Sequence, residues 1–410
     1  MTISRRGFIG STLGTASAIA LHGETNSADA ASAVPQRAAA RSSLGPWLEI
    51  DAAAIAHNVA AIAARCGNRP VLAVAKNNAY GCGLSTAGPI LSRLNAVWGL
   101  AVVRPEEALA LLDAGVRKPI LLMGPASADE AVVLARRGVR LAPYSERDGT
   151  QLIGLARRLG RAIPVHLYVD TGMHRMGMPH DRVAAWLESP RLRRAIRIEG
   201  ALTELVEDQD FDREQAARMQ RLAERVRAGG LSLGRLHGAS SDAIMRPTPE
   251  SFLDAVRPGL SIYGGYPTDE SLARGELRCA YRLKARVVRV DPLAAGEGVS
   301  YHRRWMAHEP TTIATLAIGH VDGYPSGATK GCEVQIAGAR YPVVGTVSAS
   351  HTIVALGPAA RVTVGDEAIL VGPDHPSLHP NEIAKRSAWS EYNMFMHLNP
   401  SLPRVVIAAG

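Results

Sequence analysis

The sequence has few cysteines and few aromatic residues, and these shortages exclude several classes of protein. Its cysteines are too far apart for a zinc motif, and a chain of this length needs no disulfide framework; they are Cys66, Cys82, Cys279 and Cys332. The net charge is +8, but the basic residues lie in short runs with no aromatic side chains between them. Solvated helix faces explain such runs better than a nucleic-acid interface. We therefore expect no metal site and no nucleic-acid partner.

The first 42 residues lack an apolar run long enough to span a membrane, because the stretch from Phe8 to Leu21 is short. Its flank, Arg5-Arg6 followed by Phe8, resembles a twin-arginine export signal, and Ala28-Asp29-Ala30 offers small residues at cleavage spacing. We treat residues 1–42 as a signal and disordered leader, and expect export to the periplasm with no membrane anchor. The alternative is a disordered tail that happens to contain two arginines.

Beyond the leader, short apolar runs alternate with helix-patterned segments such as 104–114 and 128–137, which is typical of an α/β fold. Asp51 can cap a first helix that runs through Ala63. Eight strands, each trailing a helix, predict a (β/α)₈ TIM barrel over residues 43–281, with a doubly wound open sheet as the alternative. The predicted strands are Val71 to Ala75, Trp98 to Val103, Pro119 to Met123, Val139 to Pro143, Pro164 to Asp170, Arg197 to Leu202, Gly234 to Ala239 and Pro258 to Tyr263.

From about Leu283 the pattern changes to alternating β segments that are punctuated by glycine and proline. This pattern predicts a C-terminal all-β domain over residues 282–410. The predicted segments are Leu283 to Val290, Thr311 to Ile318, Glu333 to Ile336, Arg340 to Val347, Thr352 to Leu356 and Glu367 to Val371.

The first barrel strand ends at a lone lysine, Lys76, in the run VLAVAKNNAYGCG. In a barrel the chemistry lies at the carboxyl ends of the strands. Lys76 is either a solvated residue that ends a strand, or a nucleophilic amine whose pKa is lowered in a poorly solvated pocket and which can condense with a carbonyl group. If a helical turn follows, Tyr80 points the same way as Lys76, and the two face a common site.

This run resembles the cofactor-lysine motif of the alanine racemase family, barrel enzymes that use pyridoxal 5'-phosphate (PLP). Two further strand ends are similar to the family's elements. The run from Asp170 to Gly177 resembles DTGM.R.G, which implies that Arg175 reaches the cofactor's phenolic oxygen and binds substrate. The run from Arg257 to Leu260 resembles RPG, which implies that Arg257 faces the pyridine nitrogen. Gly259 and the following amide of Leu260 would then hold the phosphate.

A tyrosine in the second domain completes the resemblance. Gly298-Val299-Ser300-Tyr301 is similar to the family's GVSYG motif, whose tyrosine is a base that enters the partner subunit's active site. Racemisation requires proton exchange on both faces of a planar carbanion. The resemblance implies that Tyr301 serves one face and Lys76 the other, in a homodimer with shared active sites. A buried structural tyrosine is the alternative.

Several positions depart from the family pattern. Glu204 replaces the histidine that follows the sixth strand, and the run from His237 to Ser241 keeps a serine that can donate to phosphate. Near the substrate carboxylate, Ala349 lies between two serines where the family has Cys-Met-Asp, and the tyrosine that closes the phosphate site falls at Pro400. Smaller residues at these places suggest a pocket that accepts substrates other than, or broader than, alanine.

The resemblance covers about residues 45 to 410 and implies a PLP-dependent racemase that interconverts free L- and D-amino acids. One rival is an enzyme of the same fold with other α-carbon chemistry, a decarboxylase or β-eliminase, which Glu204 and the run from Ser348 to Ser350 favour. A second is a non-catalytic PLP-binding protein. Retention of Tyr301 speaks against that rival, because carriage of a cofactor needs no second base.

Overall fold

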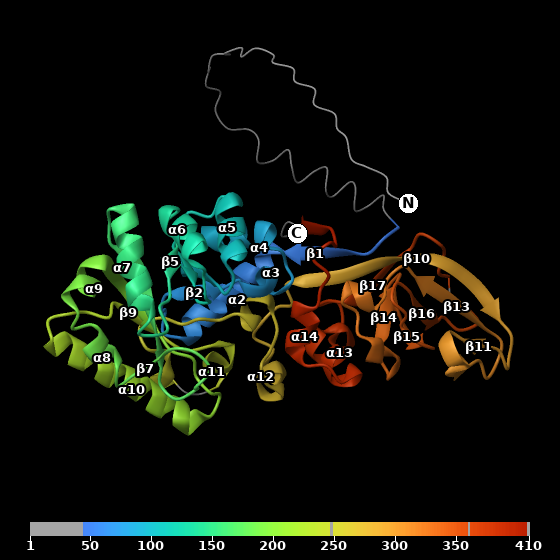
Figure 1. The fold of residues 1–410 in the computed structure, drawn as a ribbon. Coiled ribbons are helices and arrows are strands. Elements are labelled where there is room, and N and C mark those ends of the chain that lie inside the picture. Colours follow the sequence, from blue (N-terminus) through green and yellow to red (C-terminus); the bar gives the residue numbers. More distant parts are fainter. Residues whose placement is uncertain (1–43, 247–248, 360, 408–410) are drawn as a thin grey trace, which may run out of the picture.

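The computed structural model describes residues 44–246, 249–359 and 361–407, which form two domains side by side (Figure 1). A parallel barrel is followed by an antiparallel β domain, so the predicted fold class is confirmed. The leader assigned to residues 1–42 lies outside the described residues. Among those that are described, no helix is long and apolar enough to cross a membrane.

The barrel is one sheet of parallel strands that closes on itself. Its strands pair in chain order, and the two outer strands are joined by bridges from Val71 to Val256 and from His237 to Ala255. Closure rules out the doubly wound open sheet. The strands are β2 (Val71–Val74), β3 (Val97–Val102), β4 (Ile120–Leu122), β5 (Arg140–Leu141), β6 (Ile163–Asp170), β8 (Ile196–Leu202) and β9 (Arg235–His237), with the short β7 (Met178–Pro179) beside β6.

The eighth strand lies earlier in the chain than we predicted. Ala255 and Val256 occupy its place in the barrel, whereas Leu260–Tyr263 form a 3₁₀ helix, η2. The reason lies in the backbone donors: Pro258 has none, and the amides of Gly259 and Ser261 donate to a side chain rather than to a strand. The prediction of a strand over 258–263 was therefore wrong.

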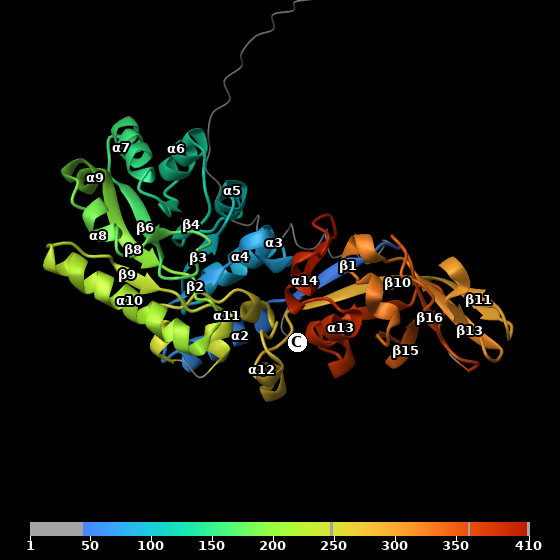
Figure 2. The same cartoon turned by 60° about the horizontal axis from the view of Figure 1, so that its bottom comes forward.

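Helices surround the barrel in the predicted alternation (Figure 2). Asp51 accepts the amide of Ala54 at 2.9 Å and caps the first helix, as predicted. The predicted helices 104–114 and 128–137 are α5 and α6. The helices of this part are α2 (Ala52–Arg65), α3 (Lys76–Tyr80), α4 (Leu84–Arg93), α5 (Pro105–Asp113), α6 (Ala128–Arg136), α7 (Asp148–Leu159), α8 (Val183–Trp186), α9 (Pro190–Ala195), α10 (Gln209–Ala228), α11 (Ser241–Met245) and α12 (Asp269–Arg274), with the 3₁₀ helix η1 (Pro249–Phe252).

The second domain is a sheet in the order β13-β16-β15-β14-β17-β10-β1-β18, and β10 also pairs with β13. The long β10 alternates buried and half-buried residues, as the sequence pattern predicts, and bends at a register shift between Val287 and Arg289. Strand β1, near the start of the chain, pairs with β10 and β18 in this sheet. The strands are β1 (Trp47–Asp51), β10 (Tyr281–Leu293), β13 (Thr311–Leu316), β14 (Glu333–Ile336), β15 (Ala339–Val344), β16 (Thr352–Ala355), β17 (Glu367–Val371) and β18 (Arg404–Ile407), with a separate hairpin of β11 (Gly298–Val299) and β12 (Trp305–Met306).

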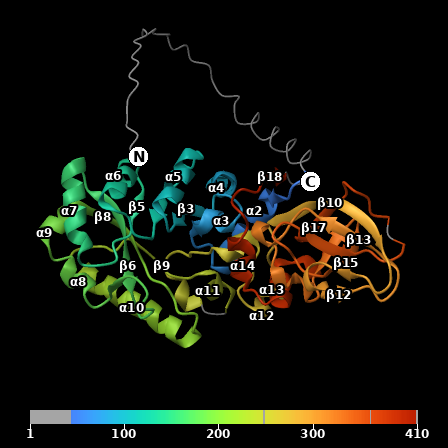
Figure 3. The ribbon, with the colours of Figure 1, turned by 45° about the vertical axis from the view of Figure 1, so that its right-hand side comes forward.

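The last helices of the chain return to the barrel. Helix α14 (Glu391–Met396) packs against α3, next to α13 (Pro380–Ser387) (Figure 3). The contact is close at Gly81, where a Cβ atom would lie 2.3 Å from the carbonyl oxygen of Phe395. The guanidinium of Arg404 also donates to the carbonyl oxygen of Gly81 at 2.9 Å. The C-terminal segment therefore fixes the turn that begins at Lys76. The remaining 3₁₀ turns are η3 (Tyr301–Arg303), η4 (His320–Asp322), η5 (Ser326–Thr329) and η6 (Pro376–Leu378).

Candidate active site

The turn after Lys76 is left-handed. Asn77, Asn78, Ala79 and Tyr80 all have φ between 50° and 57°, so the right-handed turn that we expected is absent here. A left-handed turn costs roughly 1 kcal/mol or more per residue, although asparagine tolerates it better than most residues. The ring of Tyr80 is held by stacking on Tyr263, with 5.2 Å between ring centroids. Strain of this kind persists where the surrounding structure fixes it, which is typical of functional sites.

Lys76 and Tyr80 nevertheless face the same cavity, which has a volume of about 250 Å³ and lies at the carboxyl ends of the barrel strands. The loops after β6 and β8, the start of α11 and the segment before η2 complete its wall. The lining residues are Val74, Lys76, Tyr80, Met123, Met173, Arg175, Glu204, Leu205, Glu207, Ser240, Ser241, Arg257, Gly259 and Tyr392.

The amine of Lys76 is poised for chemistry. Burial lowers its pKa; the carboxylate of Glu204 opposes this effect, and Arg175 and Arg257 add to it. Within the described part of the chain, no hydrogen bond or ion pair engages its Nζ. A half-buried, unpaired amine with a lowered pKa is a better nucleophile and base at neutral pH than a solvated lysine. The geometry therefore favours the reactive interpretation of Lys76.

Arg257, which lines the cavity, is held in place by polar contacts on several sides. Its guanidinium donates to Glu204 Oε2 at 3.0 Å, to the carbonyl oxygen of Thr203 at 3.0 Å, and to His237 Nδ1 at 3.3 Å. Glu204 Oε2 also lies 3.8 Å from a guanidinium nitrogen of Arg175. Glu204 therefore joins the two arginines in one ion-pair network, which holds Arg257 in a single orientation.

A buried pair of histidines continues this network into the barrel interior. Because Arg257 can only donate, His237 Nδ1 must accept, and its Nε2–H donates to His166 Nδ1 at 2.8 Å. Burial lowers the pKa of His166 to about 4 and that of His237 well below its usual value. Both rings are therefore neutral at pH 7, and they position Arg257 without adding positive charge.

We expect this pair to make the fold sensitive to acid. The folded-state pKa of His166 lies below its unfolded value, so its contribution to stability is present above about pH 6.5 and is lost as the pH falls towards 4. The loss is on the order of 3 kcal/mol for this one ring. His166→Asn retains an acceptor for His237 but cannot titrate. Urea unfolding at pH 7 and pH 4.5 should show a smaller pH-dependent loss of the free energy of unfolding in this variant than in the parent protein, and equal losses would contradict this assignment.

The wall of the cavity formed by Ser241 and Gly259 can bind an anion. Ser241 Oγ accepts the amides of Gly259 and Ser261, each at 3.1 Å, which leaves its own hydrogen free to donate. In the described residues, the buried hydroxyl of Ser261 has no hydrogen-bond partner. Leu260 donates its amide to the Tyr80 hydroxyl. Converging amides and hydroxyls, with no side chain at Gly259, are the features that hold a phosphate group.

Two predicted site residues lie elsewhere in the subunit. Tyr301 is 66% exposed, on the η3 turn of the second domain, and does not line the cavity. Ala349 lies in the turn between β15 and β16, where its carbonyl oxygen accepts the amide of Val321. The hydroxyl of Ser300 donates to the carbonyl oxygen of Thr346 at 3.2 Å, so the Tyr301 turn packs on the segment that leads to Ala349. The two therefore belong to one surface, separate from Lys76.

Comparisons with known proteins agree with this arrangement. The N-terminal domain profile of alanine racemases matches residues 50–267, and the C-terminal domain profile matches residues 280–406. The chain belongs to the alanine racemase family. It is 33% identical to the alanine racemase of Desulforamulus reducens over 88% of this chain and 98% of that protein. It is 36% identical to that of Mycolicibacterium smegmatis over 79% of this chain and 85% of that protein.

Solved structures of alanine racemases show the same fold. That of Clostridium difficile superimposes with a TM-score of 0.81 at 26% identity, over 89% of this chain and 96% of that one. That of Bartonella henselae, which has covalently bound pyridoxal phosphate, superimposes with a TM-score of 0.74 at 25% identity, over 88% of this chain and 99% of that one. This member of the alanine racemase family is accordingly a PLP-dependent racemase, and the anion-binding wall fits the phosphate of that cofactor.

Gly259 offers a direct test of the phosphate wall in this alanine racemase homologue. A Cβ atom at Gly259 would lie 2.2 Å from the hydroxyl oxygen of Tyr80, whose ring cannot move freely because it is stacked. We expect Gly259→Ala to weaken PLP binding by about tenfold or more, as overpacking commonly costs 1–3 kcal/mol. Titration of the cofactor-free protein with PLP measures the effect. Gly154→Ala, in an open position on α7, is the matched control, and an unchanged affinity in Gly259→Ala would contradict the assigned wall.

Sequence reasoning missed several residues of the cavity. Tyr392 lines it from α14, whereas the sequence comparison had assigned the closing tyrosine's position to Pro400, and that assignment was wrong. Only the return of α14 to the barrel reveals Tyr392. Met123 and Glu207 also line the cavity, although nothing in the sequence distinguishes them from ordinary loop residues. Met173 lines it too, and it lies in the run from Asp170 to Gly177, where no role was predicted for it. Seven predicted residues do line it, and they are Lys76, Tyr80, Arg175, Glu204, Ser241, Arg257 and Gly259; His237 and Leu260 lie directly behind them.

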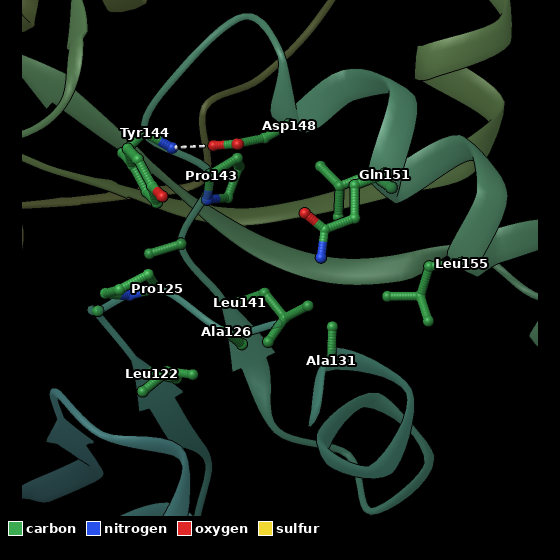
Figure 4. Close-up of a pocket in the computed structure, with 13 residues that line it drawn as sticks. Leu122, Pro125, Ala126, Ala131, Leu141, Pro143, Tyr144, Asp148, Gln151 and Leu155 are labelled. Atoms are coloured by element: carbon green, nitrogen blue, oxygen red, sulfur yellow. Dashed lines mark hydrogen bonds between the residues drawn. The ribbon is translucent and has the colours of Figure 1, made fainter. Parts of the chain in front are cut away.

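A second cavity, of about 50 Å³, lies between α6, α7 and the ends of β4 and β5 (Figure 4). Its walls are mainly leucine, alanine and proline side chains. Its one carboxylate, Asp148, accepts the amides of Tyr144 and Ser145 at 2.8 and 2.9 Å. A carboxylate that is committed to backbone amides leaves no reactive group there, so the Lys76 cavity is the candidate active site of this alanine racemase homologue.

Proposed function

We propose that the protein interconverts the L- and D-forms of a free amino acid, with Lys76 and the partner subunit's Tyr301 exchanging the α-proton on opposite faces. The observation that carries the proposal is the half-buried, unpaired amine of Lys76 with its lowered pKa, in the same cavity as the phosphate wall. PLP, when bound, supplies the electron sink that makes the α-proton of an amino acid acidic. Arg175, Arg257, Ser241 and the amides near Gly259 would hold it.

Proton transfer is left to the residues of this chain. The amine of Lys76, with its lowered pKa, can take up a proton at Nζ and return it. The phenols of Tyr80 and Tyr392 are poor candidates for the second base, because burial raises the pKa of both. The second proton-transfer group must then come from outside this set. The exposed Tyr301 is available for that role in a second copy of the chain.

A homodimer with shared sites is part of the proposal. In the Tyr301 turn, Ser300, His302 and Arg303 have φ values of 64°, 62° and 47°, in the left-handed region that such residues rarely adopt. Strain around an exposed aromatic side chain indicates a turn shaped for an external contact. Ala349 lies on the same surface, so we propose that it reaches the partner's substrate together with Tyr301.

We further propose a substrate range wider than alanine. The small side chain of Ala349, and the ion pair that commits Glu204 to Arg257 at 3.0 Å, leave room for a larger amino-acid side chain. Single-enantiomer amino acids of increasing size, followed by chiral chromatography, test the proposal. Appearance of the mirror-image amino acid supports racemisation, an amine or keto acid would indicate a decarboxylase or β-eliminase, and strict use of alanine would remove the wider range.

Export is a separate proposal that depends on Arg5-Arg6 and the short apolar stretch after it. A folded enzyme that acquires its cofactor before export suits the twin-arginine route. Fractionation of cells that express the full chain, with mass spectrometry of the mature N-terminus, tests it. Periplasmic protein that begins after residue 30 supports export, and uncleaved protein retained in the cytoplasm when Arg5 and Arg6 are intact contradicts it.

A further inference from the structure

Glu207 gives the active-site cavity an unusual wall. It lies in the loop between β8 and α10, three residues after Glu204, and lines the same cavity as Lys76. Its φ of 67° is left-handed, which a glutamate adopts only where the surroundings hold it. The carboxylate of Asp212 supplies that hold, because it accepts the amides of Val206, at 3.0 Å, and of Glu207. The backbone is therefore fixed in the conformation that presents Glu207 to the cavity.

The two carboxylates of the cavity differ in their partners. Glu204 is neutralised by Arg257 at 3.0 Å and by Arg175 at 3.8 Å. Glu207 forms no ion pair with a described residue. Arg246, whose charge acts on Glu207, is itself paired with Asp242 at 2.6 Å. The wall at Glu207 therefore carries uncompensated negative charge.

Neighbouring carboxylates add to the negative charge around Glu207. Glu207 is an exposed residue, but the partial burial of its carboxylate and the carboxylates of Asp242, Asp212 and Glu204 raise its pKa, while Arg246 lowers it. Three carboxylates, of Glu207, Asp212 and Asp242, thus share a single guanidinium. A cation placed beside Glu207 would relieve that repulsion.

The groups that share the cavity with Glu207 can pack against the aliphatic part of a substrate side chain. Tyr392 lies close enough that, after burial, Glu207 exerts the largest influence on its pKa. Met123 and Met173 add flexible apolar surface to the same cavity. An apolar stem that ends in a positive charge packs well against aromatic and methionine side chains while its head meets a carboxylate.

We infer that Glu207 selects amino acids whose side chains end in a positive charge, such as ornithine, lysine and arginine, as substrates of this site. The inference rests on the racemase function proposed above and names a class within its wider range. Glu207 would act as a substrate-binding residue for the side-chain cation, whereas the α-carbon chemistry remains with Lys76 and Tyr301.

The first test compares lysine with alanine in the holoenzyme. We expect Glu207→Gln to lower the ratio of kcat/KM for lysine to that for alanine by about tenfold, the effect typical of one lost charge-assisted contact. The matched control is Asp208→Asn. Asp208 is the adjacent carboxylate, does not line the cavity, and caps α10 by accepting the amide of Phe211 at 3.0 Å, a role that asparagine also fills. The control should leave the ratio unchanged.

The second test measures binding without turnover. 6-Amino-2-hydroxyhexanoate has the lysine side chain but no α-amine, and 2-hydroxyhexanoate lacks the cation as well. Calorimetry should show that the holoenzyme binds the first about tenfold more tightly, and that Glu207→Gln abolishes the difference. Equal affinities in the parent protein, or a ratio of lysine to alanine that Glu207→Gln leaves unchanged, would overturn the inference. If the parent protein racemised neither amino acid, the proposed function would fail, while the binding comparison would still decide whether Glu207 recognises a cation.

Discussion

Replacing Lys76 with alanine is expected to lower racemisation by at least about ten-thousand-fold, because one residue then loses both covalent cofactor attachment and proton transfer on one face. The expectation follows from the position of the amine, half-buried after the end of β2, in the same cavity as the phosphate wall and without a partner in the described chain. Chiral chromatography of single-enantiomer alanine and lysine measures the loss. Mass spectrometry after borohydride reduction measures the attachment of PLP to the chain.

Two variants make the Lys76 result specific. Lys76→Arg keeps a positive charge in the cavity but cannot condense with a carbonyl, so it should be as inactive as Lys76→Ala. Lys330→Ala removes an exposed lysine of the second domain and should retain full activity and full labelling. Residual activity within about tenfold of the parent protein in Lys76→Ala would show that another group carries the chemistry, since general acid–base catalysis alone contributes 10²–10⁴-fold.

The fold followed from local pattern wherever a strand was buried on both faces. Strand β2 is a continuous apolar run, β6 is apolar except for His166 and Asp170, and the capped helix after Asp51 carries its own start signal. The prediction failed at 258–263, where a serine hydroxyl from another segment accepts the backbone amides. Such a bond joins residues 18 and 20 positions apart, and no window of the sequence reveals it.

The site residues likewise divide into those that the local sequence predicts and those that only long-range contacts reveal. Lys76 and Arg175 could be predicted because each follows a predicted barrel strand, where parallel strands gather their carboxyl ends. Arg257 precedes the strand predicted at 258–263 and was assigned only through the family resemblance. Tyr392 could not, because it enters the cavity from a helix that belongs to the other end of the chain. The left-handed turn through Tyr80 was also beyond prediction, since it is held by the stacked Tyr263 and by the close approach of Phe395 at Gly81. Long-range packing, rather than propensity, decides these features.

Tyr301→Phe is expected to lower racemisation by about a thousand-fold, since it removes the proposed base on the second face. Tyr301 is exposed on the second domain and does not line the Lys76 cavity of its own subunit, so the proposal places it in another subunit's cavity. Co-expression of Lys76→Ala chains with Tyr301→Phe chains therefore distinguishes shared sites from separate ones. Random pairing makes half of the dimers mixed, and each mixed dimer has one site with an intact Lys76 and an intact Tyr301, so about a quarter of the parental activity should return.

If both groups acted within one chain, every site in the mixture would lack one of them, and the activity would not exceed that of the single variants. Tyr341→Phe is the matched control, because Tyr341 is a half-buried tyrosine of β15 in the same domain. It should be fully active by itself. Size-exclusion chromatography of each variant checks that neither substitution prevents pairing, so a failure to regain activity in intact mixed dimers would contradict the shared site. Recovery near a quarter, by contrast, requires that Tyr301 cross from one subunit to the Lys76 cavity of the other, because no arrangement within a single chain produces it.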